Sequence, residues 1–309
     1  MATSTIEVDA LTRAGFTVRA RSASELDLTR GDERLVAHLV RQKTSPTRAQ
    51  LEQARELPAG EVVLFVTPRA TLRGRQLVAQ EPRAWLVTHD GAATLGGEPS
   101  EASPERPAAR GRVPWGRYAL MRVLARQGEP RTQLQLAAEV GLTQGAVSGA
   151  LAKLGDAVRA SDAGWTTADP QLLWDVFLTE YPGAQGVRTH WYSRLPFVRQ
   201  TELLRPLARL SADAGAEVIA PWRTPVRAVA YVAEPIDMEA LGFAPATAEE
   251  ATADLVIPAD RTVFATAAAW GLDVADPLLV AWDLRDVGGN DAEEAVAQLR
   301  RVVLESIPA

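Results

Sequence analysis

The residue types best suited to chemistry gather on one short segment near the middle of the chain. Four side chains that can hydrogen-bond phosphates or base edges share one side of a helix expected over about residues 144–154, namely Thr143, Gln144, Ser148 and Lys153. Gly145 on the same side is a poor helix former, but it would let the backbone come close to a duplex. This pattern predicts that the helix contacts double-stranded DNA.

Further candidate contacts flank that helix. Arg131, Thr132 and Gln133 stand at the start of the preceding helix, and Arg159 and Trp165 stand on a two-stranded ribbon that follows. The arginines suit phosphate or minor-groove contact, and an exposed tryptophan can stack on a base. We expect these residues to extend the DNA contact on both sides of the reading helix.

The net charge is distributed unevenly along the chain. The whole chain carries -6, whereas residues 106–160 carry nine Lys or Arg and three Asp or Glu, which gives +6. Residues 1–105 carry -1 and residues 161–309 carry -11. Because phosphate binding depends on the charge of the contact face, the middle segment favours a nucleic-acid partner despite the acidic total. The acidic C-terminal segment should face away from DNA and could bind a basic protein.

The elements that must position these residues form a helix-turn-helix with a wing. We expect helices over residues 115–126, 132–140 and 144–154, then strands over residues 157–160 and 164–167. Gly141 can adopt the positive φ of the turn, and small Ala137 and Ala138 let the helices cross closely. The core Leu136-Ala137-Ala138-Glu139-Val140-Gly141-Leu142-Thr143-Gln144-Gly145-Ala146-Val147-Ser148 resembles that of bacterial winged-helix repressors.

The N-terminal segment predicts an α/β domain. Its expected order of a helix, three strands, a helix, a strand, a helix and a strand resembles restriction-endonuclease-like domains, whose members use an Asp on the second strand and an acid-x-Lys pair on the third. Asp27 and Lys43 could fill two of these places. Residues 34–51 contain no Asp or Glu, however, and Arg41 stands where the acid belongs. We therefore expect a non-catalytic scaffold, and a metal-dependent nuclease is the alternative.

Composition excludes several other kinds of site. The chain has no cysteine and three histidines, so thiol nucleophiles and cysteine-based metal centres are absent and a histidine-based one is not expected. We find no phosphate-binding or nucleophile-elbow motif. We expect no catalytic residue, metal or cofactor, no membrane span, and a cytoplasmic protein.

Four segments follow from the composition: an α/β domain over residues 1–97, a Pro- and Gly-rich linker over 98–111, the winged helix over 112–168 and a C-terminal α/β domain over 169–309. In the last we expect helices at 170–181, 197–214 and 291–304. We expect strands at 217–220, 227–233 and 253–257, with a further apolar block at 277–284. Asp283 would then lie near a strand end, as a functional carboxylate or a helix or turn cap.

The winged helix is followed by Asp169-Pro170-Gln171-Leu172-Leu173-Trp174, by Pro277-Leu278-Leu279-Val280-Ala281-Trp282-Asp283-Leu284 and by Asn290-Asp291-Ala292-Glu293-Glu294-Ala295. Over residues 112–304 this arrangement resembles the AbiEi-type antitoxin and transcriptional-regulator family. The resemblance implies a DNA-binding autorepressor. Trp282 and Asn290 depart from the family's usual Tyr and Arg, which weakens the expectation of a toxin partner more than that of DNA binding.

We therefore expect a sequence-specific, antitoxin-like repressor or autoregulator that binds double-stranded DNA. A toxin or other protein partner of the acidic C-terminal domain and a homodimer are left open. Two alternatives differ in class. The first is a nuclease or other DNA-processing protein targeted by its winged helix, and the second is a module whose winged helix binds protein.

Overall fold

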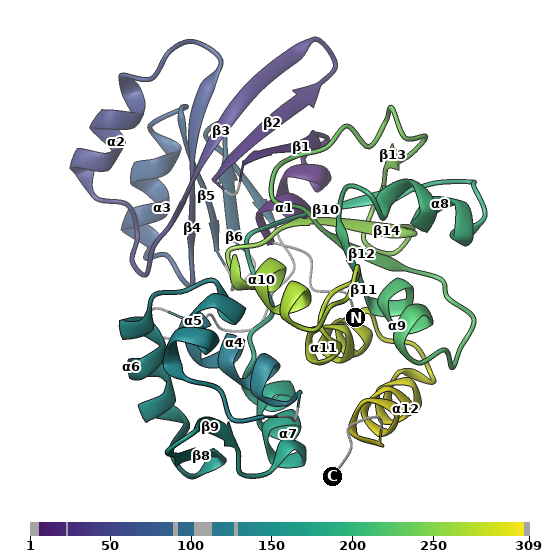
Figure 1. The fold of residues 1–309 in the computed structure, drawn as a ribbon. Helices are drawn as coiled ribbons and strands as arrows, with labels where there is room; N and C mark the ends of the chain where they lie inside the picture. Colours follow the sequence, from purple (N-terminus) through teal and green to yellow (C-terminus); the bar gives the residue numbers. More distant parts are fainter. Residues whose placement is uncertain (1–5, 23, 89–91, 102–112, 127–128, 306–309) are drawn as a thin grey trace.

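The protein is a mixed α/β structure with three sheets in the part that the computed structural model describes, which is residues 6–22, 24–88, 92–101, 113–126 and 129–305 (Figure 1). The N-terminal sheet and its helices occupy one end of the molecule in this view. The winged helix occupies the opposite end, and the C-terminal sheet lies beside both.

The N-terminal part contains a seven-stranded sheet in the order β1-β2-β3-β4-β5-β6-β7. Its elements are α1 (Ile6–Arg13), β1 (Thr17–Ser22), β2 (Glu25–Arg30), β3 (Glu33–Arg41), α2 (Arg48–Arg55), β4 (Glu61–Thr67), α3 (Leu72–Ala79), β5 (Ala84–Thr88), β6 (Ala92–Leu95) and β7 (Glu98–Glu101). Strands β3, β4 and β5 run parallel, and the outer pairs are antiparallel. The predicted order of elements is confirmed.

The predicted linker begins too early. Residues 98–101 form β7, which pairs with β6 through a tight turn at Gly96 and Gly97. Both glycines have positive φ, 60° and 87°, the geometry that such a hairpin requires. Glycine and proline favour turns as well as linkers, so composition alone did not reveal the hairpin. Residues 102–111 lie outside the described residues.

The three helices and two strands expected over residues 115–167 are present, and we call this segment the winged helix. It consists of α4 (Trp115–Leu124), α5 (Gln133–Val140), α6 (Gln144–Leu154), the short 3-10 turn η1 (Gly155–Ala157), β8 (Val158–Ser161) and β9 (Gly164–Thr167). Gly141 ends α5 in the left-handed conformation, with φ 67°. The Thr143 side chain caps α6 by accepting a hydrogen bond from the backbone N–H of Ala146.

The C-terminal part contains a five-stranded sheet in the order β11-β12-β14-β10-β13. Its elements are α7 (Pro170–Glu180), β10 (Val187–Tyr192), α8 (Phe197–Leu204), β11 (Arg209–Ser211), α9 (Ala212–Ile219), β12 (Ala228–Tyr231), β13 (Ala244–Pro245), β14 (Ala253–Ile257), α10 (Thr262–Ala269), α11 (Pro277–Val287) and α12 (Ala292–Glu305).

Three of the predicted C-terminal elements are wrong. Residues 197–214 form α8, β11 and the start of α9, because Pro206 cannot continue the first helix. Residues 217–220 belong largely to α9. Residues 277–284 lie in α11, which Asp276 caps and Pro277 begins. This helix is apolar on most sides because it contacts α7, α9 and α12 at once, so it lacks the amphipathic period of a surface helix.

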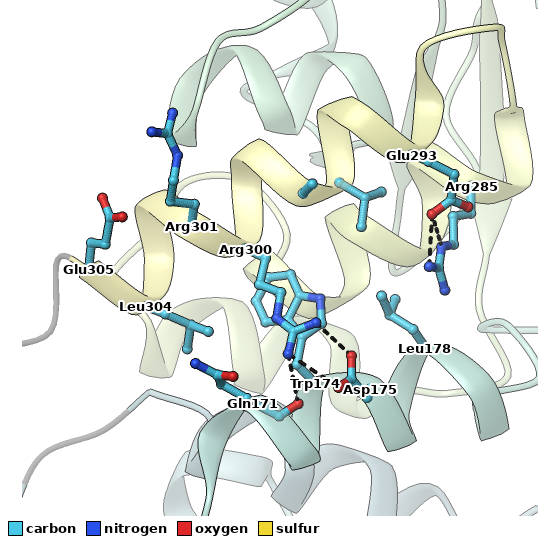
Figure 2. Close-up of a pocket in the computed structure, with 12 residues that line it drawn as sticks. Gln171, Trp174, Asp175, Leu178, Arg285, Glu293, Arg300, Arg301, Leu304 and Glu305 are labelled. Carbon is cyan, nitrogen blue, oxygen red and sulfur yellow. Dashed lines mark hydrogen bonds and ion pairs between the residues drawn. The ribbon is translucent and has the colours of Figure 1, made fainter.

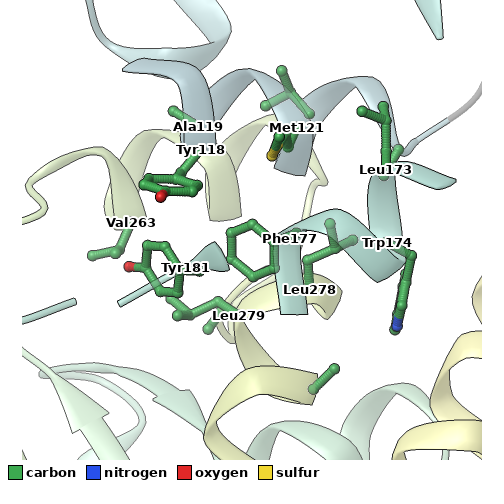
Figure 3. Packing of buried hydrophobic residues seen from close by; sticks show 14 of the residues in the cluster. Tyr118, Ala119, Met121, Leu173, Trp174, Phe177, Tyr181, Val263, Leu278 and Leu279 are labelled. Carbon is green, nitrogen blue, oxygen red and sulfur yellow. The ribbon is translucent and has the colours of Figure 1, made fainter. Parts of the chain in front are cut away.

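The winged helix and the C-terminal part share one hydrophobic core. A single cluster of buried residues extends from Tyr118 to Val303, and α10 packs against α4 and α5. Figure 3 shows Tyr118 of α4 facing Phe177 and Tyr181 of the α7 region, beside Val263 of α10. The boundary predicted at residues 168 and 169 therefore separates two chain segments that pack as one body.

A buried ionic cluster joins the same two segments. Arg122 of α4 is fully buried, and its guanidinium donates to Asp260 at 2.9 Å, to Thr262 at 2.6 Å and to Asp276 at 3.3 Å. The Tyr181 hydroxyl also donates to Asp260, at 2.9 Å. Burial opposes the charge on Arg122, but Asp260 and Asp276 together keep its pKa above the usual value. We call these residues the Arg122 cluster.

Replacing Arg122 should therefore destabilise the whole protein. In Arg122→Met, Asp260 and Asp276 remain buried without a cation, and we expect the free energy of unfolding to fall by about 3–5 kcal/mol. Arg159→Ala, at an exposed arginine on the wing, should change it by less than about 0.5 kcal/mol. Urea unfolding followed by circular dichroism measures both, and near-equal stabilities would contradict this role of the cluster.

Asp283 lies within α11, not near a strand end, and it caps no helix. It is fully buried and accepts hydrogen bonds from Ser211 Oγ at 2.5 Å and from the Tyr231 hydroxyl at 2.9 Å. Burial raises its pKa to about 7, although the charge of Arg188 and the hydrogen bond from Ser211 act in the opposite direction. Asp283 thus takes up its proton more readily in the folded protein than in the unfolded chain.

This shift predicts a pH dependence of stability. Because the folded-state pKa of Asp283 lies above its unfolded value, its contribution is complete below about pH 4 and is lost as the pH rises towards 7. We expect the stability of Asp283→Asn relative to the wild type to rise across this range, by at most about 1.4 kcal/mol per pH unit. Urea unfolding at pH 4, 5.5 and 7 tests it. A difference that stays constant with pH would show that Asp283 is ionised throughout.

Candidate nucleic-acid interface

Helix α6 presents one face to solvent and buries the other. Val147, Leu151 and Leu154 are buried against the core, as the apolar spacing predicted. The opposite face carries the predicted contact residues Thr143, Gln144, Gly145, Ser148 and Lys153, all of which are exposed. A Cβ added at Gly145 or Gly149 would meet no atom within 4 Å. The exposed face of α6 therefore has two positions without a side chain, which leave its backbone open to a large partner.

The residues at the start of α5 are divided between structure and surface. The Thr132 side chain accepts a hydrogen bond from the backbone N–H of Gln135, and the Gln135 side chain accepts one from the backbone N–H of Thr132. This capping box fixes the beginning of α5. Thr132 remains exposed and Gln133 is half-buried, so their positions beside the turn stay open to contact.

Arg131 does not lie where a phosphate contact needs it. It is only 8% exposed, and its guanidinium donates to the carbonyl of Val123 and to the carboxylate of Glu139, the latter at 3.1 Å. Burial lowers the pKa of Arg131, and the charge of Glu139 opposes that effect. The sequence could not show that Glu139, eight residues later, turns this side chain inward. Arg131 thus supports the fold, and its buried guanidinium is not exposed as the predicted DNA contact requires.

The wing is hydrogen-bonded to the backbone of Arg131. The backbones of Arg131 and Trp165 exchange two hydrogen bonds, of 3.0 and 2.8 Å, so Arg131 forms an isolated β-bridge with β9. Gly164 approaches so closely that a Cβ there would lie 2.5 Å from the Arg131 backbone, and its φ is 134°. Trp165 is half-buried against the core, whereas Arg159 is exposed on β8. Of the two, Arg159 is the better placed to reach DNA.

The winged helix offers few free cations. Four of its six described Lys and Arg side chains are engaged inside the protein: Arg117 with Glu180, Arg122 in its cluster, Arg126 with Glu139 and the carbonyl of Ala269, and Arg131 with Glu139. Only Lys153 and Arg159 are exposed without a partner in the described part of this segment. The predicted charge of +6 also counts Arg106, Arg110 and Arg112, which lie outside the described residues.

Sequence reasoning missed a second group of free cations, on the N-terminal part. Lys43, Arg69 and Arg73 are exposed, and none of their side chains has a hydrogen bond or ion pair with the residues that the structure describes. The signal was present in the sequence, because residues 34–51 and 62–80 contain no Asp or Glu. Only the fold shows that the two stretches adjoin.

The residues weighed for a nuclease do not come together. Asp27 of β2 pairs with Val36 of β3 and forms an ion pair with Arg21 at 3.1 Å. Lys43 stands seven residues beyond Val36, and at about 3.3 Å per residue of strand this places it roughly 20 Å from Asp27. Among the described residues, no group of three His, Cys, Asp or Glu side chains could hold a metal ion.

A shallow groove of about 360 Å³ lies between α7 and α12 (Figure 2). Its charged rim is paired internally, since Arg300 binds Asp175 at 2.7 Å and Arg285 binds Glu293 at 2.9 Å. The indole N–H of Trp174 is buried at the groove without an acceptor in the described structure. Arg301 and Glu305 also line the groove, so its lining carries both charges in equal number and shows no preference for a ligand of either sign.

Comparisons with known proteins found no match, whether to a family model, to a curated protein or to a solved structure. Within the described ranges, no helix is both long and apolar enough to span a membrane.

The assignment of Arg131 to the fold gives a contrast with Arg159. Arg131→Ala leaves Glu139 without its better-placed partner and should lower the free energy of unfolding by about 1–3 kcal/mol. Arg159→Ala should leave stability unchanged within about 0.5 kcal/mol. Thermal unfolding of the two single variants measures the difference. Equal melting temperatures would show that Arg131 is not a structural residue.

Proposed function

We propose that this protein is a sequence-specific, double-stranded DNA-binding transcriptional regulator, and that α6 enters the major groove. The observation that carries the proposal is the exposed face of α6, where Gln144 and Ser148 stand one turn apart beside two glycines. Amide and hydroxyl groups can read base edges, and the missing side chains let the helix axis approach the bases.

The wing and the turn would hold the duplex in register. Arg159 on β8 is exposed and unpaired in the described structure, so it can contact a phosphate beside the major groove. Lys153 near the end of α6 can contact a second one. Thr143 caps α6 and keeps an exposed hydroxyl group that can donate to the DNA backbone, whereas the Thr132 hydroxyl already donates to the Gln135 side chain at 3.0 Å.

The proposed role is that of a repressor or autoregulator of antitoxin-like type, acting in the cytoplasm where its DNA lies. The segment from residue 161 to the end carries -11 and would avoid the duplex, which leaves it available for a basic protein such as a toxin. The exposed α6 face also favours this function over a purely structural winged helix, since a packing module would bury that face against its neighbours.

Substituting the reading residues tests the proposal. Genome-wide mapping of bound DNA, starting with the region upstream of the protein's own gene, supplies the operator. In Gln144→Ala plus Ser148→Ala we expect operator affinity to fall by about tenfold or more, with little change for a scrambled duplex, because each good base contact contributes about 1–3 kcal/mol of discrimination. Fluorescence anisotropy with both duplexes measures this.

Gln53→Ala on α2 is the matched control, since Gln53 is an exposed glutamine on a helix far along the chain from α6. If the double variant and the control bind the operator equally well, α6 is not the reading helix. If the wild type binds no duplex, the winged helix has another partner, and a protein-binding role takes its place.

A further inference from the structure

The winged helix alone supplies little charge for a nucleic-acid partner. Its described residues present two unpaired cations, Lys153 and Arg159, and they also include the exposed carboxylates Asp156 and Asp162. Specific DNA-binding proteins obtain much of their affinity from several phosphate contacts. If α6 reads DNA, other parts of the molecule must supply phosphate contacts as well.

Lys43, Arg69 and Arg73 form a compact group, which we call the basic edge. Strands β3 and β4 are parallel and in register, with Arg41 opposite Val66, so the segments that follow them leave the same edge of the sheet. The backbone N–H of Thr71 donates to Ser45 Oγ at 3.2 Å, which ties these two segments together. Each of the three cations stands two residues from Ser45 or Thr71 in the sequence.

Close packing holds the two segments in place. A Cβ added at Gly74 would lie 2.6 Å from Ser45 Oγ, so only glycine fits at this contact. The neighbouring cations Arg41, Arg48 and Arg55 pair with Glu7, Glu52 and Glu81. These ion pairs engage three carboxylates of the N-terminal part. The basic edge therefore keeps its positive charge on a rigid surface.

The orientation of the sheet brings this edge towards the winged helix. In Figure 1 the carboxyl ends of β3 and β4 point down towards α5, on the side of the molecule that also carries α6. The hairpin between β2 and β3, which holds Arg34, points the opposite way. A duplex seated on α6 and extending past α5 would meet the basic edge and not the hairpin.

We propose that the basic edge is a second DNA contact, which binds backbone phosphates flanking the base pairs read by α6. This inference rests on the proposed function. These cations suit phosphates and not bases. Lys43, Arg69 and Arg73 carry their charge on long flexible side chains, and no reading helix lies beside them. The contact therefore adds affinity that is independent of sequence.

Lysine acetylation can report on each surface separately, because the chain has two lysines, Lys43 on the basic edge and Lys153 on α6. Acetylation of the full-length protein, with and without a 30-base-pair operator duplex, followed by peptide mass spectrometry, reports each surface separately. We expect DNA to slow acetylation of both lysines by about fivefold or more. The N-terminal amine serves as the internal control.

The outcomes distinguish the two proposals. Protection of Lys153 alone would overturn the second contact and leave the reading helix in place. Protection of Lys43 alone would support DNA binding at the basic edge but overturn the proposed role of α6, and with it the bridging arrangement. Protection of neither lysine would overturn both.

The salt dependence of binding gives an independent measurement. In Lys43→Ala plus Arg69→Ala plus Arg73→Ala, operator and scrambled duplex should lose affinity by the same factor. The slope of log K against log salt should become shallower by about 2.7, at about 0.9 per lost phosphate contact. Arg34→Ala, on the same β3 strand but at its far end, is the matched control. An unchanged slope in the triple variant would overturn the inference.

Discussion

The position of the winged helix depends on one buried charge. Arg122 cannot lose its proton and cannot reach water, so α4 is stable only where Asp260 and Asp276 approach its guanidinium. Both carboxylates stand at turns that begin α10 and α11, and Asp276 also caps α11 through the backbone N–H of Leu279. The charge requirement of one helix therefore fixes the ends of two others. Through α4 it fixes the direction in which α6 faces.

The same requirement explains why the charge of the middle segment is a poor guide to its surface. A count along the chain gives a strongly basic block, yet Arg117, Arg122, Arg126 and Arg131 are directed at carboxylates or carbonyls within the protein. Arginine is well suited to such buried pairing because its guanidinium is planar and has five donors. Arginines that are engaged in stabilising contacts within the protein are not available to contact a partner. If α6 binds DNA as proposed, further phosphate contacts must come from cations elsewhere in the fold.

The sequence predicted the parts of the structure whose signals are local. Gly141 and Thr143 mark the turn and the cap of α6 within three residues, and the alternation of strands and helices gave the N-terminal order. The predictions failed where a contact between residues far apart in the sequence determines the structure. The block at 277–284 has the composition of a buried strand and becomes a helix because it is enclosed on most sides. Arg131 turns inward because of Glu139, and Lys43 joins Arg69 only through the parallel pairing of β3 and β4.

The packing of the N-terminal part against the C-terminal sheet affects how DNA would be read. The N-terminal part is fixed to the C-terminal sheet, since Val187 of β10 packs into its core and Arg41 donates to the carbonyl of Gly186 at 2.9 Å. That sheet shares a core with α4, so packed contacts connect the basic edge to α6. Two contacts that are connected through packed cores bind together where the duplex presents phosphates and bases at the matching spacing. Curvature and groove geometry of the flanking DNA would then enter the selectivity, although the basic edge touches no base.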